Sequence, residues 1–264
     1  MKTKQEIIEN WLPRYTGVPI EKFTRYILLT NFQGYLDEFA HSHNTEVFDR
    51  TVAMPTAVAG DITMINFGMG SPNAATVMDL LGAIDPHAVL FLGKCGGLKK
   101  KNELGDLILP IAAIRGDGTS DDYLPSEVPA LPAFNLQRAV SHVIRDMGRD
   151  YWTGTVFSTN RRVWEHDDKF KEYLRVVRSM AIDMETATLF TVGFTNEIPT
   201  GALLLVTDQP MIEAGVKTQE SDKMVTEKFA TRHLEIGIAS LHEIIENKAS
   251  VKHLKFNWER PTNS

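Results

Sequence analysis

Residues 61–84, "DITMINFGMGSPNAATVMDLLGAI", contain the alternation on which the fold depends. The first part is a compact apolar run of the kind that favours a β-strand, and it ends in glycines. Ser71 follows as a plausible helix N-cap, with Pro72 at the first helical position. The stretch therefore predicts a strand, a glycine turn and a helix.

The same alternation continues on both sides of this stretch. Further strands are predicted at 25–32, 88–93, 152–159, 180–185 and 201–208, extended chain at 104–116, and helices at 135–148, 169–179, 186–194 and about 221–247. Strands that alternate with helices imply an α/β fold with a largely parallel sheet covered by helices on both faces. In that architecture a ligand lies beyond the carboxyl ends of the strands.

The N-terminal part shows a different pattern. Residues 2–11 have the spacing of a short amphipathic helix, and the segment "LPRYTGVP" (12–19) is expected to end it. We therefore treat 1–24 as a helical extension of one domain that covers 1–264. No composition shift or repeat marks a second domain.

Composition and charge exclude several classes of protein. The net charge of -6 argues against a nucleic-acid partner, although a local cluster of cations could still hold one small anion. No apolar run is long enough to span a membrane, and the N-terminus lacks the apolar core of a signal peptide. The single cysteine, Cys95, rules out an internal disulfide and suits a reducing compartment, so we expect a cytoplasmic protein.

Several candidate motifs admit an ordinary structural explanation. The segment "GMGSPNA" has two glycines of a dinucleotide fingerprint, but Asn73 stands at the third, which leaves a structural turn or a phosphate or sugar cradle. Cys95 is more easily explained as a small buried residue than as a nucleophile. Arg161 and Arg162 suit either a surface salt bridge or a contact with a base and phosphate. The histidines show no metal-binding spacing beyond "HSH" (41–43), and we expect no metal.

Three carboxylates at predicted strand ends stand out. Asp183 and Glu185 lie in "SMAIDMETATLF" (179–190), where a buried strand meets a helix, and Asp208 ends "LLLVTD". Helix capping explains one of them, but buried acids are costly unless they are hydrogen-bonded or functional. One acid that holds a sugar diol and another that protonates a leaving base are what N-glycosidic cleavage requires.

Five segments, "FGMGSPNA", "LGKCGGL", "GTVFSTN", "AIDMETAT" and "LLLVTDQP", occur in the order typical of one family. With them the chain resembles the nucleoside phosphorylases and nucleosidases, and within that family the bacterial nucleosidases that act on AMP. The resemblance implies a three-layer, phosphorylase-like α/β fold with a central mixed sheet. It also implies that Met184 packs on the ribose, that Glu185 accepts hydrogen bonds from the ribose hydroxyls and that Asp208 protonates N7 of the purine. Asp183 is then a residue behind the site or a cap of the following helix.

Departures from the phosphorylase pattern are also informative. The segment "LLTNF" replaces the phosphate-binding turn of the first strand, Phe91 replaces an arginine, and Lys94 replaces a loop serine. Arg162 stands where relatives stack an aromatic side chain on the purine. These changes imply water as the nucleophile and a substrate that carries its own phosphate, with Lys94 as a desolvated cation that lacks a partner nearby in sequence.

The resemblance thus implies hydrolysis of AMP to adenine and ribose 5-phosphate without a metal or organic cofactor. The alternatives are a purine nucleoside phosphorylase, a nucleoside or methylthioadenosine nucleosidase, and a catalytically silent purine-nucleotide-binding regulator. Family members assemble as hexamers built from dimers, so we expect a homo-oligomer. Full-length relatives have an extra N-terminal regulatory domain, and their allosteric control is not carried over to this sequence. The predicted catalytic residues are Asp208 and Glu185, and the predicted substrate-binding residues are Met184, Gly70, Met69, Lys94, Cys95, Gly96, Phe157, Thr159, Arg162 and Asn31.

Overall fold

A computed structural model describes residues 2–247 of the chain. The strands are β1 (Tyr26–Thr30), β2 (Thr56–Ala59), β3 (Ile62–Asn66), β4 (Ala88–Gly97), β5 (Leu107–Gly116), β6 (Trp152–Thr159), β7 (Ala181–Asp183) and β8 (Thr200–Asp208). The α-helices are α1 (Lys4–Thr16), α2 (Gln33–Ser42), α3 (Ser71–Leu81), α4 (Phe134–Asp146), α5 (Asp168–Val176), α6 (Thr186–Thr195) and α7 (Gln219–Glu246), and short 3-10 turns lie at Ile20–Lys22, Thr119–Asp122 and Glu213–Gly215.

The eight strands form one mixed sheet in the order β2-β3-β1-β4-β7-β6-β5-β8, and β4 also pairs with β8. Strands β3, β1, β4 and β8 are parallel neighbours, and so are β5, β6 and β7. Short antiparallel pairings, β4 with β7 and β5 with β8, join the two groups. The second group thereby closes on β4 and β8 as a ring of five strands, which confirms the predicted mixed, largely parallel sheet.

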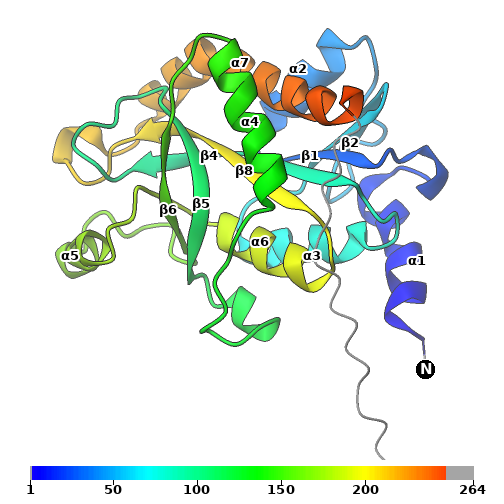
Figure 1. Cartoon of the computed structure of the whole chain (residues 1–264), viewed down its shortest axis with the longest axis horizontal. Coiled ribbons are helices and arrows are strands. Elements are labelled where there is room, and N and C mark those ends of the chain that lie inside the picture. Colours follow the sequence, from blue (N-terminus) through cyan, green and yellow to red (C-terminus); the bar gives the residue numbers. More distant parts are fainter. Residues whose placement is uncertain (1, 248–264) are drawn as a thin grey trace, which may run out of the picture.

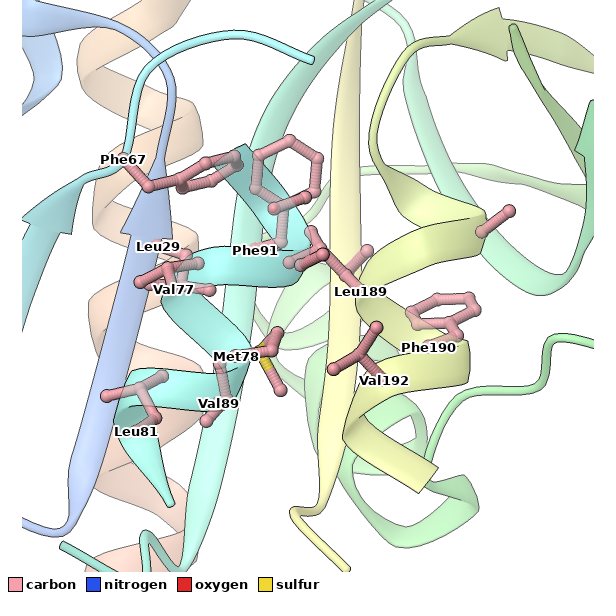
Figure 2. Packing of buried hydrophobic residues seen from close by; sticks show 14 of the residues in the cluster. Leu29, Phe67, Val77, Met78, Leu81, Val89, Phe91, Leu189, Phe190 and Val192 are labelled. Carbon is pink, nitrogen blue, oxygen red and sulfur yellow. The ribbon is translucent and has the colours of Figure 1, made fainter. Parts of the chain in front are cut away.

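Helices cover both faces of this sheet, as Figure 1 shows. One apolar cluster joins α1, α3 and α6 to side chains such as Leu29 and Phe91, and the other joins α2, α4 and α7 to side chains such as Leu28 and Leu90. Figure 2 shows the first cluster, in which α3 and α6 direct apolar side chains toward one another and onto the strands. Alternate residues of β1 and β4 thus face opposite layers, as the two-residue period of a strand requires.

Several element boundaries differ from those predicted. Helix α1 runs through Pro13 to Thr16, because Leu12 and Thr16 are buried, and it ends where Gly17 takes a φ of 71°. The N-cap of α3 is Gly70 rather than Ser71, whose hydroxyl donates to the carbonyl of Met184 at 2.7 Å. Pro72 does lie in the first turn, as predicted.

Two elements escaped the sequence analysis, and one strand is longer than predicted. Helix α2 buries Tyr35, Leu36, Phe39 and Ala40 on one face, a spacing that the sequence contains but that we did not use. The short edge strand β2 also went unnoticed. Strand β4 continues past residue 93 to Gly97, because its last residues pair with β8 and β7.

Candidate active site

A pocket opens at the carboxyl ends of β1, β4, β6, β7 and β8, where the architecture predicted it. Ten of the twelve predicted site residues line it. They are Asn31, Met69, Lys94, Cys95, Gly96, Thr159, Arg162, Met184, Glu185 and Asp208, and the other lining residues are Phe32, Arg161, Trp164, Glu165, Ile182, Asp183 and Lys217.

Two irregularities in the sheet bring the strand ends together. Strands β4 and β7 pair antiparallel, only at Gly96 with Ile182 and Gly97 with Ala181, so the carboxyl end of β4 lies against the short strand that leads into Asp183. The register between β4 and β8 shifts after Cys95, so that Gly96 lies opposite Asp208. A side chain at residue 96 would approach Asp208 Oδ2 to 3.2 Å, so glycine leaves room for this carboxylate. Such bulges commonly redirect a side chain beside a site.

Asp183 is fixed by the polypeptide around it. Its Oδ1 accepts from Ser158 Oγ at 2.6 Å, and its Oδ2 accepts from the backbone N–H and hydroxyl of Thr186 at 2.8 and 2.5 Å. Burial raises the pKa of Asp183, and these hydrogen bonds oppose the rise. Asp183 therefore supplies the helix-capping contact of α6 that the sequence analysis assigned to one acid of the pair.

Glu185 faces the pocket and is held from several sides. Its Oε1 accepts from the backbone N–H of Gly70 at 2.7 Å, and its Oε2 accepts from the N–H of Met184 at 3.3 Å. Gly70 has a φ of 96°, a conformation that suits glycine and turns this N–H toward the carboxylate. Burial and the negative charge of Asp183 raise the pKa of Glu185. Gly70 thus serves the site through its backbone and does not line the pocket.

Asn31 connects Glu185 to the ligand space. Its side chain opposes the rise in the pKa of Glu185, and its Oδ1 is buried without a hydrogen-bond partner in the region from residue 2 to 247. A buried carbonyl oxygen without a donor is unfavourable. Because Asn31 lines the pocket, a ligand hydroxyl could supply the missing hydrogen bond.

Asp208 lies across the pocket at the end of β8. Its Oδ1 accepts from Thr207 Oγ1 at 3.0 Å and lies 3.7 Å from Lys217 Nζ. Burial raises the pKa of Asp208, and the positive charge of Lys217 opposes the rise. A carboxyl group with a raised pKa keeps its proton to higher pH, as a general acid must.

Lys94 is a buried cation within β4, not in a loop as predicted. Its Nζ donates to Thr226 Oγ1 at 2.7 Å, lies 3.5 Å from Asp222 Oδ1 and sits 4.3 Å from the centre of the Phe32 ring. Burial lowers the pKa of Lys94. Its hydrogen-bonding and ionic partners, Thr226 and Asp222, come from α7, more than a hundred residues later, so the sequence near Lys94 does not reveal them.

Other cations reach the pocket from its rim. Arg162 Nη1 lies 3.6 Å from Glu165 Oε1, and Arg161 Nη2 lies 3.0 Å from Asp167 Oδ2, so both arginines belong to local ion pairs and to the pocket lining. Lys217 was missed, because it lies in an irregular segment before α7 that no strand-end pattern marks. Arg115, by contrast, holds together the loop that follows β5, through contacts with residues 120–128.

The structure excludes Phe157 from the pocket and places Cys95 in it. Phe157 does not line the pocket: it packs against Phe170 and Tyr173, where it fills a small cluster. Cys95 lines the pocket, as predicted, and burial and the charge of Asp183 raise the pKa of its thiol, which agrees with the preference for a buried residue over a thiolate nucleophile. Phe91, at the position of a phosphorylase arginine, lies in the core with its ring 5.7 Å from that of Phe67.

The described residues offer no other obvious chemistry. Within residues 2–247, no group of three or more His, Cys, Asp or Glu side chains is arranged to hold a metal ion. No helix in this part of the chain is both long and apolar enough to cross a membrane.

The fold and the pocket agree with a family match. The model of the phosphorylase superfamily matches residues 25–242, and the chain belongs to this superfamily. The crystal structure of an AMP nucleosidase from Bacteroides thetaiotaomicron superposes with a TM-score of 0.85 at 57% identity, covering 94% of this chain and 100% of that one.

More distant relatives agree with this family assignment. The AMP nucleosidase of Escherichia coli is 29% identical over 276 residues, which cover 87% of this chain and 57% of that protein. This chain therefore matches little more than half the length of that relative. A uridine phosphorylase from Vibrio fischeri shares the fold, with a TM-score of 0.76 at 20% identity over 86% of this chain and 95% of its own.

Proposed function

We propose that this protein hydrolyses the N-glycosidic bond of AMP, giving adenine and ribose 5-phosphate. The main support is its 57% identity, over 94% of the chain, to a protein solved as an AMP nucleosidase. The pocket is consistent with that activity, since it combines buried acids with cations suited to a phosphate. Hydrolysis needs a purine, a ribose and a phosphate to be recognised together, and the pocket has groups suited to each.

In this proposal Glu185 and Asn31 bind the ribose hydroxyls and Met184 packs on the sugar. Each carboxylate oxygen of Glu185 already accepts one backbone N–H, and each retains capacity for a further hydrogen bond. The carboxylates also favour the positive charge that develops on the sugar as the bond to the base breaks.

Asp208 acts as the general acid in the same proposal. The C1'–N9 bond breaks with its electrons moving to the base, while Asp208 transfers a proton to N7, so adenine leaves uncharged. Water adds its oxygen to C1', and the proton that it loses restores Asp208. Atoms and charge balance as AMP plus water giving adenine plus ribose 5-phosphate.

Lys94, Lys217 and Arg162 are proposed to meet the 5'-phosphate. Lys94 is buried in β4 and lies in the pocket lining, and a second cation, Lys217, shares its carboxylate partner. Buried lysines are unfavourable without compensation, and a phosphate dianion compensates more strongly than one carboxylate.

A single product analysis tests this function against its alternatives. The protein would be incubated with AMP, IMP, adenosine or methylthioadenosine, each with and without inorganic phosphate, and the sugar product would be identified. Ribose 5-phosphate from AMP without added phosphate is expected. Ribose 1-phosphate from a nucleoside would instead identify a phosphorylase, hydrolysis only of nucleosides a nucleosidase, and tight purine binding without turnover a regulator.

We also propose that the protein is a cytoplasmic homo-oligomer, a hexamer built from dimers. Large apolar side chains such as Ile111, Phe134, Val163 and Val176 are exposed on the single chain, which is consistent with contacts to further copies. Sedimentation velocity checks this assembly: a mass near 29.6 kDa would contradict it, and a mass of about six times that value is expected.

A further inference from the structure

Asp222 joins two pocket cations that come from different parts of the fold. Its Oδ1 lies 3.5 Å from Lys94 Nζ, on β4, and 3.5 Å from Lys217 Nζ, on the segment before α7. Asp222 itself belongs to the first turn of α7 and does not line the pocket. One carboxylate oxygen, outside the pocket lining, therefore lies within ion-pair distance of two ammonium groups.

The two lysines need a negative charge near them. The Lys94 side chain is 5% exposed and that of Lys217 is 24% exposed, and the positive charge of Lys217 lowers the pKa of Lys94. Asp222 opposes that repulsion. Without an anion, the two cations would be poorly compensated in a low-dielectric pocket.

The contacts of Asp222 are nevertheless loose. Charge-assisted N–H···O bonds are typically about 2.7–2.9 Å long, so both distances of 3.5 Å exceed that range. The Asp222 side chain is 41% exposed, so water can solvate it whenever the lysines turn away. Lys94 keeps its close hydrogen bond to Thr226 without Asp222. Asp222 therefore holds the two lysines in place, but an anion that binds them more strongly can readily displace it.

We propose that Asp222 is a specificity-determining residue that compensates Lys94 and Lys217 in the ligand-free protein and gives them up to the phosphate of the ligand. This inference rests on the proposed function for the identity of that phosphate. A neutral nucleoside offers no anion with which to displace Asp222, whereas a phosphate dianion does. The same competition limits how tightly the product ribose 5-phosphate is held.

Helix capping is the alternative explanation for Asp222. An acid in the first turn of a helix is stabilised by the helix dipole, and Glu220 lies in the same turn of α7. Glu220 is exposed and forms no ion pair with the pocket lysines among the described residues. It therefore provides a matched control that removes the same charge from the same turn.

The experiment compares the wild type, Asp222→Asn and Glu220→Gln by calorimetric titration with ribose 5-phosphate and, separately, with ribose. We expect Asp222→Asn to lower the dissociation constant of ribose 5-phosphate at least about threefold, and Glu220→Gln to leave it nearly unchanged. Ribose affinity should be the same in all three. In the Lys94→Met background the gain from Asp222→Asn should shrink, because one of the two competing cations is gone.

Equal or weaker binding of ribose 5-phosphate by a folded Asp222→Asn protein would overturn the proposal, as would an equal gain in Glu220→Gln. Wild-type protein that binds no ribose 5-phosphate would overturn it as well. Thermal melts establish that each variant is folded. Adenine release from AMP is measured in parallel: if the wild type binds ribose 5-phosphate but leaves AMP intact, the proposed function fails while the titrations still decide the role of Asp222.

Discussion

The two sides of the pocket are held together by different means. On the side of β7 and α6, Asp183 and Glu185 are fixed by backbone N–H groups and short hydroxyl contacts. On the side of β8, Asp208 and Lys217 meet through an ion pair of 3.7 Å, and Lys217 shares Asp222 with Lys94. The first side is set by the course of the main chain, and the second by side chains that can exchange partners.

This difference suits the proposed chemistry. Positive charge develops on the sugar in the transition state, and groups that are already oriented stabilise that charge most effectively. A proton donor and a phosphate contact must instead change their charge environment during the reaction. The predictions below test whether the two sides really differ in this way.

The largest expected effect comes from Asp208→Asn on the exchangeable side. The amide keeps the shape of the carboxyl group but cannot transfer its proton, so we expect kcat to fall by a factor on the order of 100 to 10,000 with a much smaller change in KM. Steady-state release of adenine from AMP measures it. Near-normal turnover by the folded variant would remove Asp208 from the mechanism.

Glu185→Gln tests the fixed side. If Glu185 accepts hydrogen bonds from the ribose hydroxyls, the substitution should weaken kcat/KM for AMP by about 1.5–3 kcal/mol, the range for a hydrogen bond to a charged group. The loss should be clearly smaller with 2'-deoxy-AMP, which lacks one of the hydroxyls. Equal losses on both substrates would assign Glu185 a purely structural role.

The fixed side should also limit stability at high pH. Burial and Asp183 raise the pKa of Glu185 above its value in an unfolded chain, so the folded state favours the protonated form. Its contribution to stability is present at low pH and is lost as pH rises through the folded pKa. We expect Glu185→Gln to be more stable than the wild type by about 1–2 kcal/mol at pH 9, and the gain to vanish near pH 4. Urea unfolding at both pH values measures this, and a gain that does not depend on pH would contradict it.

Of these four predictions, the one for Lys94→Met has the smallest expected effect. Methionine replaces the long side chain inside β4 without its charge, so we expect KM for AMP to rise several-fold, by roughly 1 kcal/mol, and its salt dependence to flatten. The rate of adenosine hydrolysis, which is expected to be lower than that of AMP hydrolysis, should be nearly unchanged by the substitution. Lys100→Met, at an exposed position nearby, is the control. A variant with an unaltered preference for AMP over adenosine would direct the search for the phosphate contact to Arg161, Arg162, or Arg14 or Arg50 of another copy.

The sequence was sufficient to predict the architecture because its signals were local. Apolar runs that end in glycine or polar residues placed β3, β6 and β8 close to where they lie, and helical spacing of apolar residues did the same for α3 and α6. The edge strand β2 has four residues and no distinct period, so it carried little signal. The extension of β4 depends on pairing with β7 and β8, which are distant in sequence.

The same distinction between local and long-range signals applies to the site residues. Residues at strand ends, such as Glu185, Met184 and Asp208, could be predicted because the carboxyl ends of the strands gather in one place. The partners of Lys94 could not, since Asp222 and Thr226 are set against it only by the packing of α7. Phe157 stands in the predicted segment, but its side chain packs against Phe170 and Tyr173 and does not line the pocket.

Strand β4 pairs with β1, β7 and β8 at once, more neighbours than any other strand within residues 2–247. Its last residues, Lys94–Gly97, pair with β8 and β7, whereas β1 pairs only with residues 88–92. The pocket wall that these four residues form therefore depends on the ring of five strands. The amide protons of these residues should exchange with solvent only through the most extensive unfolding events, whereas those of the first turn of α7 should exchange through local fraying.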